Sequence, residues 1–84
     1  MSKVEIYTTF LCGYCAQAKN FLKKNGIEFV EIDVSYDHKE REKMIQRAGG
    51  KYTVPQIFID GNSIGGYDEM IELENNSSLR ELLE

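Results

Sequence analysis

The fold is decided by residues 4–15, which read VEIYTTFLCGYC. Apolar and polar side chains alternate over Val4–Thr8, with β-branched residues among them, and this pattern predicts a strand. Over Gly13–Asn25 the apolar side chains recur instead at helical spacings, which predicts a helix, and Gly26 follows where a helix C-cap belongs. The stretch is therefore a junction between a strand and a helix, with two cysteines where the helix begins.

Strands and helices continue to alternate after this junction. The remaining expected elements are a strand over residues 27–34, a helix over 37–48, a strand over 54–59, a short strand near 63–64, a helix over about 68–73 and a terminal helical turn from residue 78. Asp37 with Glu40, and Ser78 with Glu81, match capping boxes at helix starts. Residues 60–62, Asp-Gly-Asn, predict a hairpin turn.

This order of elements predicts an α/β fold. The connection from the first strand through the first helix to the second strand is expected to be a right-handed crossover, which makes those strands parallel. The hairpin makes the third and fourth strands antiparallel. A four-stranded mixed sheet with helices on both faces follows, although the pattern alone leaves the strand order open.

The composition indicates one folded domain and argues against several classes of partner. At 84 residues the chain suits one compact domain, and an apolar fraction of 42% can build its core. No apolar run approaches the ~18 residues of a transmembrane helix, and the N-terminus lacks the pattern of a signal peptide. The net charge of -4 and the scattered Lys and Arg residues argue against nucleic acid. We expect a single domain over residues 1–84, located in the cytoplasm, with neither nucleic acid nor a membrane as partner.

The chemistry is expected at the chain's two cysteines, Cys12 and Cys15, which stand at the strand–helix junction. Beside a βαβ pattern, C-x-x-C indicates a redox pair. Free amides at a helix start and the helix dipole favour a negative sulfur, and the thiolate is the species that attacks a disulfide. Cys12, nearer the helix start, is predicted to be the more exposed and to act as nucleophile. Cys15 is predicted to be the resolving thiol, which displaces a partner from Cys12 by closing a disulfide.

Three rival interpretations fit the two cysteines less well. A structural zinc site needs about four ligands, and His38 is the only other soft ligand in the sequence. A haem attachment site needs histidine directly after Cys15, where this chain has Ala16. An inert structural disulfide is out of place in a reducing compartment. No metal site is therefore expected from this chain alone.

The chain's one proline, Pro55, stands at the start of the strand expected over residues 54–59. Two interpretations are equally open. Proline is common at the first position of a strand, whereas a cis bond here would turn the backbone of Val54 outward. In the second case the N–H and C=O groups of Val54 are free to pair with an extended peptide, as in strand addition.

The loop Gly65-Gly66-Tyr67-Asp68 also has two interpretations. Glycines before a helix permit close approach of a ligand, and amides at a helix start suit an anion. Taken alone, the loop favours the simpler interpretation, in which Asp68 only caps the helix. Tyr14 and Tyr67 either line a groove or are ordinary half-exposed aromatic residues.

Three motifs together resemble the signatures of glutaredoxins in their order and spacing. They are Cys12-Gly13-Tyr14-Cys15, Thr53-Val54-Pro55 and Gly65-Gly66-Tyr67-Asp68. The similarity spans nearly the whole chain and is closest to short bacterial dithiol glutaredoxins. It implies a thioredoxin fold with strand order 2-1-3-4, a third strand antiparallel to the first, and a cis peptide bond before Pro55.

The resemblance also implies a glutathione-dependent thiol–disulfide oxidoreductase, a thioltransferase that reduces protein disulfides and glutathione mixed disulfides. Cys12 would carry the mixed disulfide with glutathione, the Val54 backbone would pair with its cysteinyl unit, and Asp68 with nearby amides would hold its γ-glutamyl end. Lys51 is a further candidate for the remaining carboxylate. The expected groove residues are Tyr14, Lys51, Thr53, Val54, Pro55, Gly66, Tyr67 and Asp68. The implied partners are glutathione and disulfide-bearing or glutathionylated proteins, with the chain itself a monomer.

Two positions depart from the pattern of the family that the chain resembles. Thr9 stands where many glutaredoxins have a lysine that supports the thiolate, and Gly13 stands where dithiol members usually have proline. In that family, a residue other than proline is associated with a [2Fe–2S] cluster shared by two monomers, which would use Cys12 and two glutathiones. One alternative to the main prediction is therefore a cluster-bridged dimer. A second alternative does not depend on these positions: some proteins that resemble glutaredoxins take electrons from thioredoxin reductase instead of glutathione.

Overall fold

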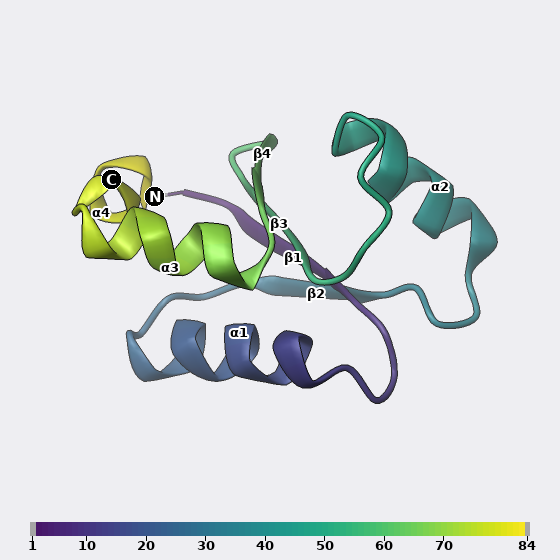
Figure 1. Ribbon diagram of the computed structural model, residues 1–84, viewed down its shortest axis with the longest axis horizontal. Coiled ribbons are helices and arrows are strands. Elements are labelled where there is room, and N and C mark those ends of the chain that lie inside the picture. The colour runs from purple at the N-terminus through teal and green to yellow at the C-terminus, as the bar shows by residue number, and fades with distance from the viewer. Residues whose placement is uncertain (1, 84) are drawn as a thin grey trace.

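The computed structural model describes residues 2–83, which form four strands and four helices (Figure 1). The strands are β1 (Val4–Thr8), β2 (Val30–Asp33), β3 (Gln56–Ile59) and β4 (Asn62–Gly65). The helices are α1 (Gly13–Lys24), α2 (His38–Arg47), α3 (Tyr67–Asn75) and α4 (Ser78–Leu83). Their order along the chain is the one that the sequence predicts.

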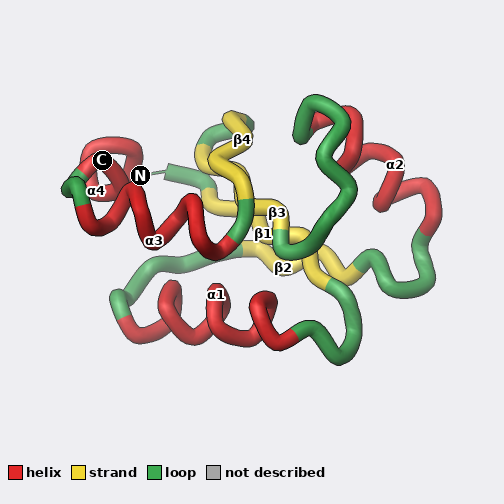
Figure 2. Tube along the Cα trace, viewed as in Figure 1, coloured by secondary structure: helices red, strands yellow, loops and turns green. Residues whose placement is uncertain are grey.

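The strands form one mixed sheet in the order β2-β1-β3-β4, shown in yellow in Figure 2. β1 pairs in parallel with β2, as the crossover through α1 requires, and antiparallel with β3. The turn between β3 and β4 has φ of 51 at Asp60 and 84 at Gly61, and positive values at both positions are those of a type I′ hairpin. The predicted strand order, the antiparallel third strand and the hairpin are confirmed.

Helices cover both faces of the sheet, so each face has a core of its own (Figure 1). One core joins α1, α3 and α4 to the sheet and contains Val4, Ile6, Ala18, Leu22, Ile57, Ile59, Met70 and Leu79. The other joins α2 to the opposite face and contains Tyr7, Val34, Met44, Ala48 and Phe58. Because side chains alternate along a strand, the neighbours Ile6 and Tyr7 belong to different cores.

The second strand is shorter than the sequence predicts. β2 begins at Val30, although the apolar alternation starts at Ile27. Gly26 has φ of 69, and the N–H of Ile27 donates a hydrogen bond to the carbonyl of Leu22 over 2.9 Å. This left-handed cap ends α1 and delays the sheet pairing, while Ile27 still packs against the core.

The two predicted capping boxes have different outcomes. The side chain of Asp37 accepts a hydrogen bond from the N–H of Glu40 over 3.0 Å, as predicted, but the N–H of Asp37 donates to the carbonyl of Val34. The prediction for Ser78 is wrong, because Ser78 lies inside α4. Its N–H donates to the side-chain oxygen of Asn76 over 3.0 Å, so an asparagine supplies the acceptor at this helix start.

Candidate active site

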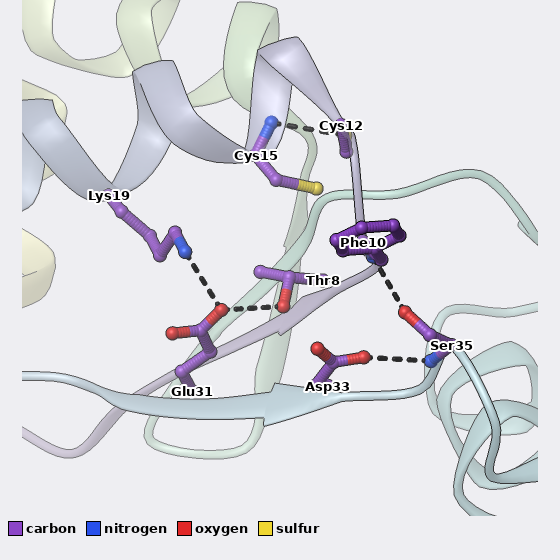
Figure 3. Close-up of polar contacts among 8 residues, drawn as sticks. All are labelled: Thr8, Phe10, Cys12, Cys15, Lys19, Glu31, Asp33 and Ser35. Carbon is purple, nitrogen blue, oxygen red and sulfur yellow. Dashed lines mark hydrogen bonds and ion pairs between the residues drawn. The ribbon is translucent and has the colours of Figure 1, made fainter.

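Cys12 occupies the N-cap of α1, where its sulfur takes the place of the usual capping oxygen (Figure 3). The N–H of Cys15 donates to the Cys12 sulfur over 3.2 Å, and the N–H of Ala16 donates to the Cys12 carbonyl over 3.1 Å. The Cys12 backbone is extended, with φ of -109 and ψ of 111, as an N-cap requires. The residue is partly exposed. Amides at a helix start favour a negative sulfur in this position, and the partial exposure of Cys12 lets its sulfur reach and attack a disulfide.

Cys15 lies one turn into α1 and has a different environment. It is 2% exposed, and burial and the neighbouring Cys12 raise the pKa of the Cys15 thiol to about 12. Both cysteines are free thiols. The predicted difference in exposure between the two cysteines is confirmed.

A groove of about 520 Å³ lies beside Cys12. It is lined by Tyr14, Lys51, Thr53, Val54, Pro55, Gln56, Gly66, Tyr67, Asp68 and Glu69. All the residues that the sequence assigned to a groove are therefore brought together. The rings of Tyr14 and Tyr67 lie 6.2 Å apart, so these two residues from α1 and α3 share the groove wall.

The peptide bond between Val54 and Pro55 is cis, which settles the choice that the sequence left open. β3 begins at Gln56 and not at Val54, because Pro55 has no N–H to donate to the sheet. The Cys12 thiol donates to the carbonyl of Val54 over 3.8 Å. The backbone of Val54 therefore faces the candidate nucleophile.

The start of α3 contributes residues to the groove lining. The helix begins at Tyr67, with Gly66 as its N-cap, and the N–H of Gly66 donates to a carboxylate oxygen of Glu69 over 2.6 Å. The interpretation that the loop favours when taken alone, in which Asp68 only caps the helix, is wrong, because Glu69 makes the capping contact. Asp68 instead lines the groove and is exposed. A Cβ atom on Gly66 would lie 3.1 Å from the carbonyl oxygen of Pro55, so glycine fits the close approach of the two segments.

A family model described as Glutaredoxin matches residues 4–64, which is most of the chain. The chain belongs to the glutaredoxin family. Glutaredoxin 1 of Rickettsia prowazekii is 48% identical to it over 80 residues, 94% of this chain and 84% of the relative. Glutaredoxin 3 of Escherichia coli is 45% identical over 83 residues, 99% of each chain.

Solved glutaredoxin structures agree with the fold. The crystal structure of a buckwheat glutaredoxin–glutathione complex has a TM-score of 0.86 at 26% identity, covering 98% of this chain and 76% of that one. The solution structure of glutaredoxin from Brucella melitensis has a TM-score of 0.83 at 44% identity, covering 96% and 87%. The fold is therefore the thioredoxin fold of glutaredoxins, and family and fold together make the chain a thiol–disulfide oxidoreductase.

Two groove residues of this glutaredoxin were missed by the sequence reasoning. Glu69 was not among the predicted residues, yet it lines the groove and its carboxylate accepts a hydrogen bond from the N–H of Gly66. Gln56 was taken as part of a buried strand, yet it is a polar residue that is 2% exposed. Its side-chain amide donates to Thr53 over 3.4 Å, and its oxygen has no hydrogen-bond partner among residues 2–83. A glutamine in an otherwise apolar run was the available indication.

Two kinds of feature are absent from the described part of this glutaredoxin. No three His, Cys, Asp or Glu side chains within residues 2–83 lie close enough together to hold a metal ion. In the same residues, no helix combines the length and the apolar character that crossing a membrane requires.

Proposed function

We propose that this glutaredoxin is a glutathione-dependent oxidoreductase that reduces glutathione mixed disulfides and protein disulfides. The observation that carries the proposal is the single groove formed by all the predicted residues, next to the sulfur that caps α1. A groove of about 520 Å³ is within the range of small-molecule sites, which suits a tripeptide. The buckwheat glutaredoxin in complex with glutathione supports the same choice of ligand.

The charges along the groove match the two ends of glutathione. Lys51 lines the groove at the Thr53 side and would meet the glycine carboxylate. Asp68 and Glu69 lie at the α3 end and would meet the α-ammonium group of the γ-glutamyl unit. The Val54 backbone, which faces Cys12, would pair with the cysteinyl unit between them.

The proposed reaction with a glutathione mixed disulfide needs only Cys12. The Cys12 thiolate attacks the glutathione sulfur, so a bond forms between these two sulfurs and the substrate leaves as a thiolate that takes up a proton. A second glutathione thiolate then attacks the glutathione held on Cys12. This step forms glutathione disulfide and returns the Cys12 thiolate.

Reduction of a protein disulfide would use both cysteines. Cys12 first forms a mixed disulfide with the substrate protein. Cys15 then loses its proton and attacks the Cys12 sulfur, which breaks the bond to the substrate and releases its second thiolate. Glutathione afterwards reduces the Cys12–Cys15 disulfide, so the electrons come from two glutathione molecules.

The test follows NADPH oxidation in two parallel coupled assays. One supplies glutathione with glutathione reductase, and the other supplies thioredoxin reductase alone. We expect turnover of a glutathionylated peptide only in the first assay, with none for Cys12→Ser and activity retained in Cys15→Ser. Turnover driven by thioredoxin reductase without glutathione would instead favour the alternative electron donor. Unchanged activity in Cys12→Ser would overturn the proposal.

The cluster-bridged dimer stays a second candidate function because Gly13 stands where dithiol members of the family usually have proline. Gly13 is exposed, and a Cβ atom built there would have no neighbouring atom within 4 Å, so the fold accepts larger side chains at this site. Anaerobic reconstitution with iron, sulfide and glutathione tests the idea by visible absorbance and by elution volume. A colourless monomer after that treatment would remove the dimer. The monomeric state, the single domain over residues 1–84 and the cytoplasmic location likewise stay predictions.

A further inference from the structure

Behind the two cysteines, α1 is joined to the neighbouring strands by a small polar network (Figure 3). The ammonium group of Lys19 lies 2.9 Å from a carboxylate oxygen of Glu31 on β2. The hydroxyl of Thr8, at the end of β1, donates to the same oxygen over 2.7 Å. Thr8 is 1% exposed, while the side chains of Lys19 and Glu31 are 28% and 36% exposed. The network is thus anchored at its buried end and holds the Lys19 side chain in a defined position.

This network lies on the side of α1 that carries Cys15. Cys15 and Lys19 are four residues apart, a spacing that places two side chains on the same helix face. In Figure 3 both side chains leave α1 toward the end of β1, where Thr8 meets Glu31. The positive charge of Lys19 also lowers the pKa of Cys15, against the larger effects of burial and of Cys12 that raise it. Lys19 is therefore a cation near the buried sulfur.

The resolving step requires a negative charge at this buried place. For Cys15 to attack the mixed disulfide, its thiol must lose a proton to solvent, and the sulfur carries the charge until its bond to Cys12 forms. The electron pair of the broken bond then leaves with the substrate thiolate, which takes up a proton. Burial opposes this step, because a charged sulfur is costly in apolar surroundings unless a cation is close.

Glu31 is a poor candidate for removing that proton. Burial raises the pKa of Glu31, but hydrogen bonds from Lys19 and Thr8 outweigh this effect and leave the pKa below its ordinary value. Glu31 is therefore a carboxylate at neutral pH and a weak base. Its contacts suit the different task of holding the Lys19 ammonium in position.

We propose that Lys19, held by Glu31 and Thr8, is a positioning residue that stabilises the anionic sulfur of Cys15 during the resolving step. The inference rests on the proposed function, since only reduction of protein disulfides would use that step. The ionisable groups that act on Cys15 are Cys12 and Lys19 on α1, and Glu31 acts from β2 through its contact with Lys19. Asp33, further along β2, raises the pKa of Glu31 through its negative charge.

The charges predict opposite effects for the two partners of the ion pair. Lys19→Met removes the cation, so the pKa of Cys15 should rise and its thiolate fraction should fall, by at most about tenfold. Because a more basic thiolate is also a better nucleophile, the resolving step should slow by no more than about threefold. Glu31→Gln keeps an oxygen that can accept from Lys19 and Thr8 but removes the opposing negative charge. The step should then run at least as fast as in the wild type.

Stopped-flow mixing of the reduced full chain with dithiobis(nitrobenzoate) separates the two cysteines. The first release of coloured thiolate reports attack by Cys12 and scales with reagent concentration. The second reports displacement by Cys15, is independent of that concentration, and disappears in Cys15→Ser. The second rate, measured between about pH 6 and pH 9, is compared with the first in each variant. Lys23→Met is the matched control, since Lys23 is an exposed lysine on the same helix.

We expect a slower second phase in Lys19→Met, recovery in Lys19→Arg, no slowing in Glu31→Gln and none in Lys23→Met. Equal slowing by Lys19→Met and Glu31→Gln would mean that the pair is only a structural link between α1 and β2, and would overturn the proposal. An unchanged second phase in Lys19→Met would also overturn it. These phases contain no glutathione, so the outcome is independent of the coupled assay that tests the proposed function.

Discussion

The N–H of Cys15 donates a hydrogen bond to the sulfur of Cys12 over 3.2 Å. Cys15 therefore holds, through its backbone, the same sulfur that its thiol is proposed to attack. The contact depends on the three-residue spacing, because an N-cap side chain reaches the amides two and three positions into a helix. The same turn points the Cys15 thiol inward, where it is 2% exposed. One helical turn thus separates an accessible sulfur from a protected one.

Alkylation should distinguish the two thiols. Because the pKa of Cys15 is raised to about 12, its thiolate fraction at pH 8 is about one in 10⁴. Burial restricts access as well. We expect iodoacetamide to modify Cys12 at least about 100-fold faster than Cys15 in the folded chain. Peptide mass mapping of timed, acid-quenched samples measures both rates. Similar rates for the two cysteines would contradict the buried position of Cys15.

Stability should fall at alkaline pH because of Cys15. Its pKa is about 12 in the folded chain against an ordinary value of 9.0, so between these values the unfolded chain binds fewer protons. The free energy of unfolding therefore falls as pH rises above about 9, and below that pH the contribution is fully present. Between pH 8 and pH 10 we expect the wild type to lose about 1.4 kcal/mol more than Cys15→Ala, by urea denaturation. Identical pH dependence in the two proteins would refute this linkage.

Much of the site was predictable because its residues belong to short sequence motifs whose backbone conformation is determined locally. The apolar spacing after Gly13 identified a helix start, which put the C-x-x-C pair there, and Cys12 indeed lies at the N-cap of α1. The groove residues came from a resemblance that fixes all three motifs at once. By contrast, the role of Lys19 depends on a contact between α1 and β2, with Glu31, and a helical pattern cannot distinguish Lys19 from a solvent-exposed charge. Glu69 makes a local contact with Gly66, three residues before it, which the predicted motifs did not include.

The helices and strands were predictable where the hydrophobic periodicity agreed with the capping and turn residues, and less so where the two signals conflicted. Residues 27–34 alternate as a strand, but the left-handed cap at Gly26 governs the backbone there, so β2 starts only at Val30. At the last helix Ser78 matched a capping box, yet Asn76 supplies the acceptor. Several polar side chains in a row offer competing caps, and sequence alone does not rank them.

Gly65→Ala should disturb the α3 end of the groove. Gly65 has φ of 100, and a Cβ atom there would lie 2.8 Å from the Glu69 side chain, so alanine adds backbone strain and a clash. We expect a loss of about 1–3 kcal/mol in the free energy of unfolding and weaker glutathione binding. Gly61→Ala is the matched control, because Gly61 has φ of 84 but open space around it. Equal losses of stability in both variants would show that the clash with Glu69 contributes nothing. Adding Glu69→Ala to Gly65→Ala should restore part of the stability, because it removes the clashing side chain.

Arg47 should stabilise the sheet face opposite α1 in a pH-dependent way. Its guanidinium contacts Glu5 over 2.9 Å and the Tyr7 hydroxyl over 2.7 Å, and lies 4.2 Å from the centre of the Phe58 ring. The hydrogen bond from Arg47 lowers the pKa of Glu5 below 4.5, so the stability it provides is present above that pH and is lost as pH falls through the lowered value. Near neutral pH, Arg47→Met should lower the free energy of unfolding by about 1–2 kcal/mol.

Chemical denaturation at about pH 7 and about pH 2 tests the role of Arg47. The difference between wild type and Arg47→Met should shrink at the lower pH, where Glu5 becomes protonated and only the contact with the aromatic rings remains to be lost. Arg47→Lys should recover only part of the stability. Lysine keeps the positive charge, but its ammonium group cannot make the paired contacts of a planar guanidinium. A difference that is the same at both pH values would assign the effect to packing on Phe58 and not to the ion pair with Glu5.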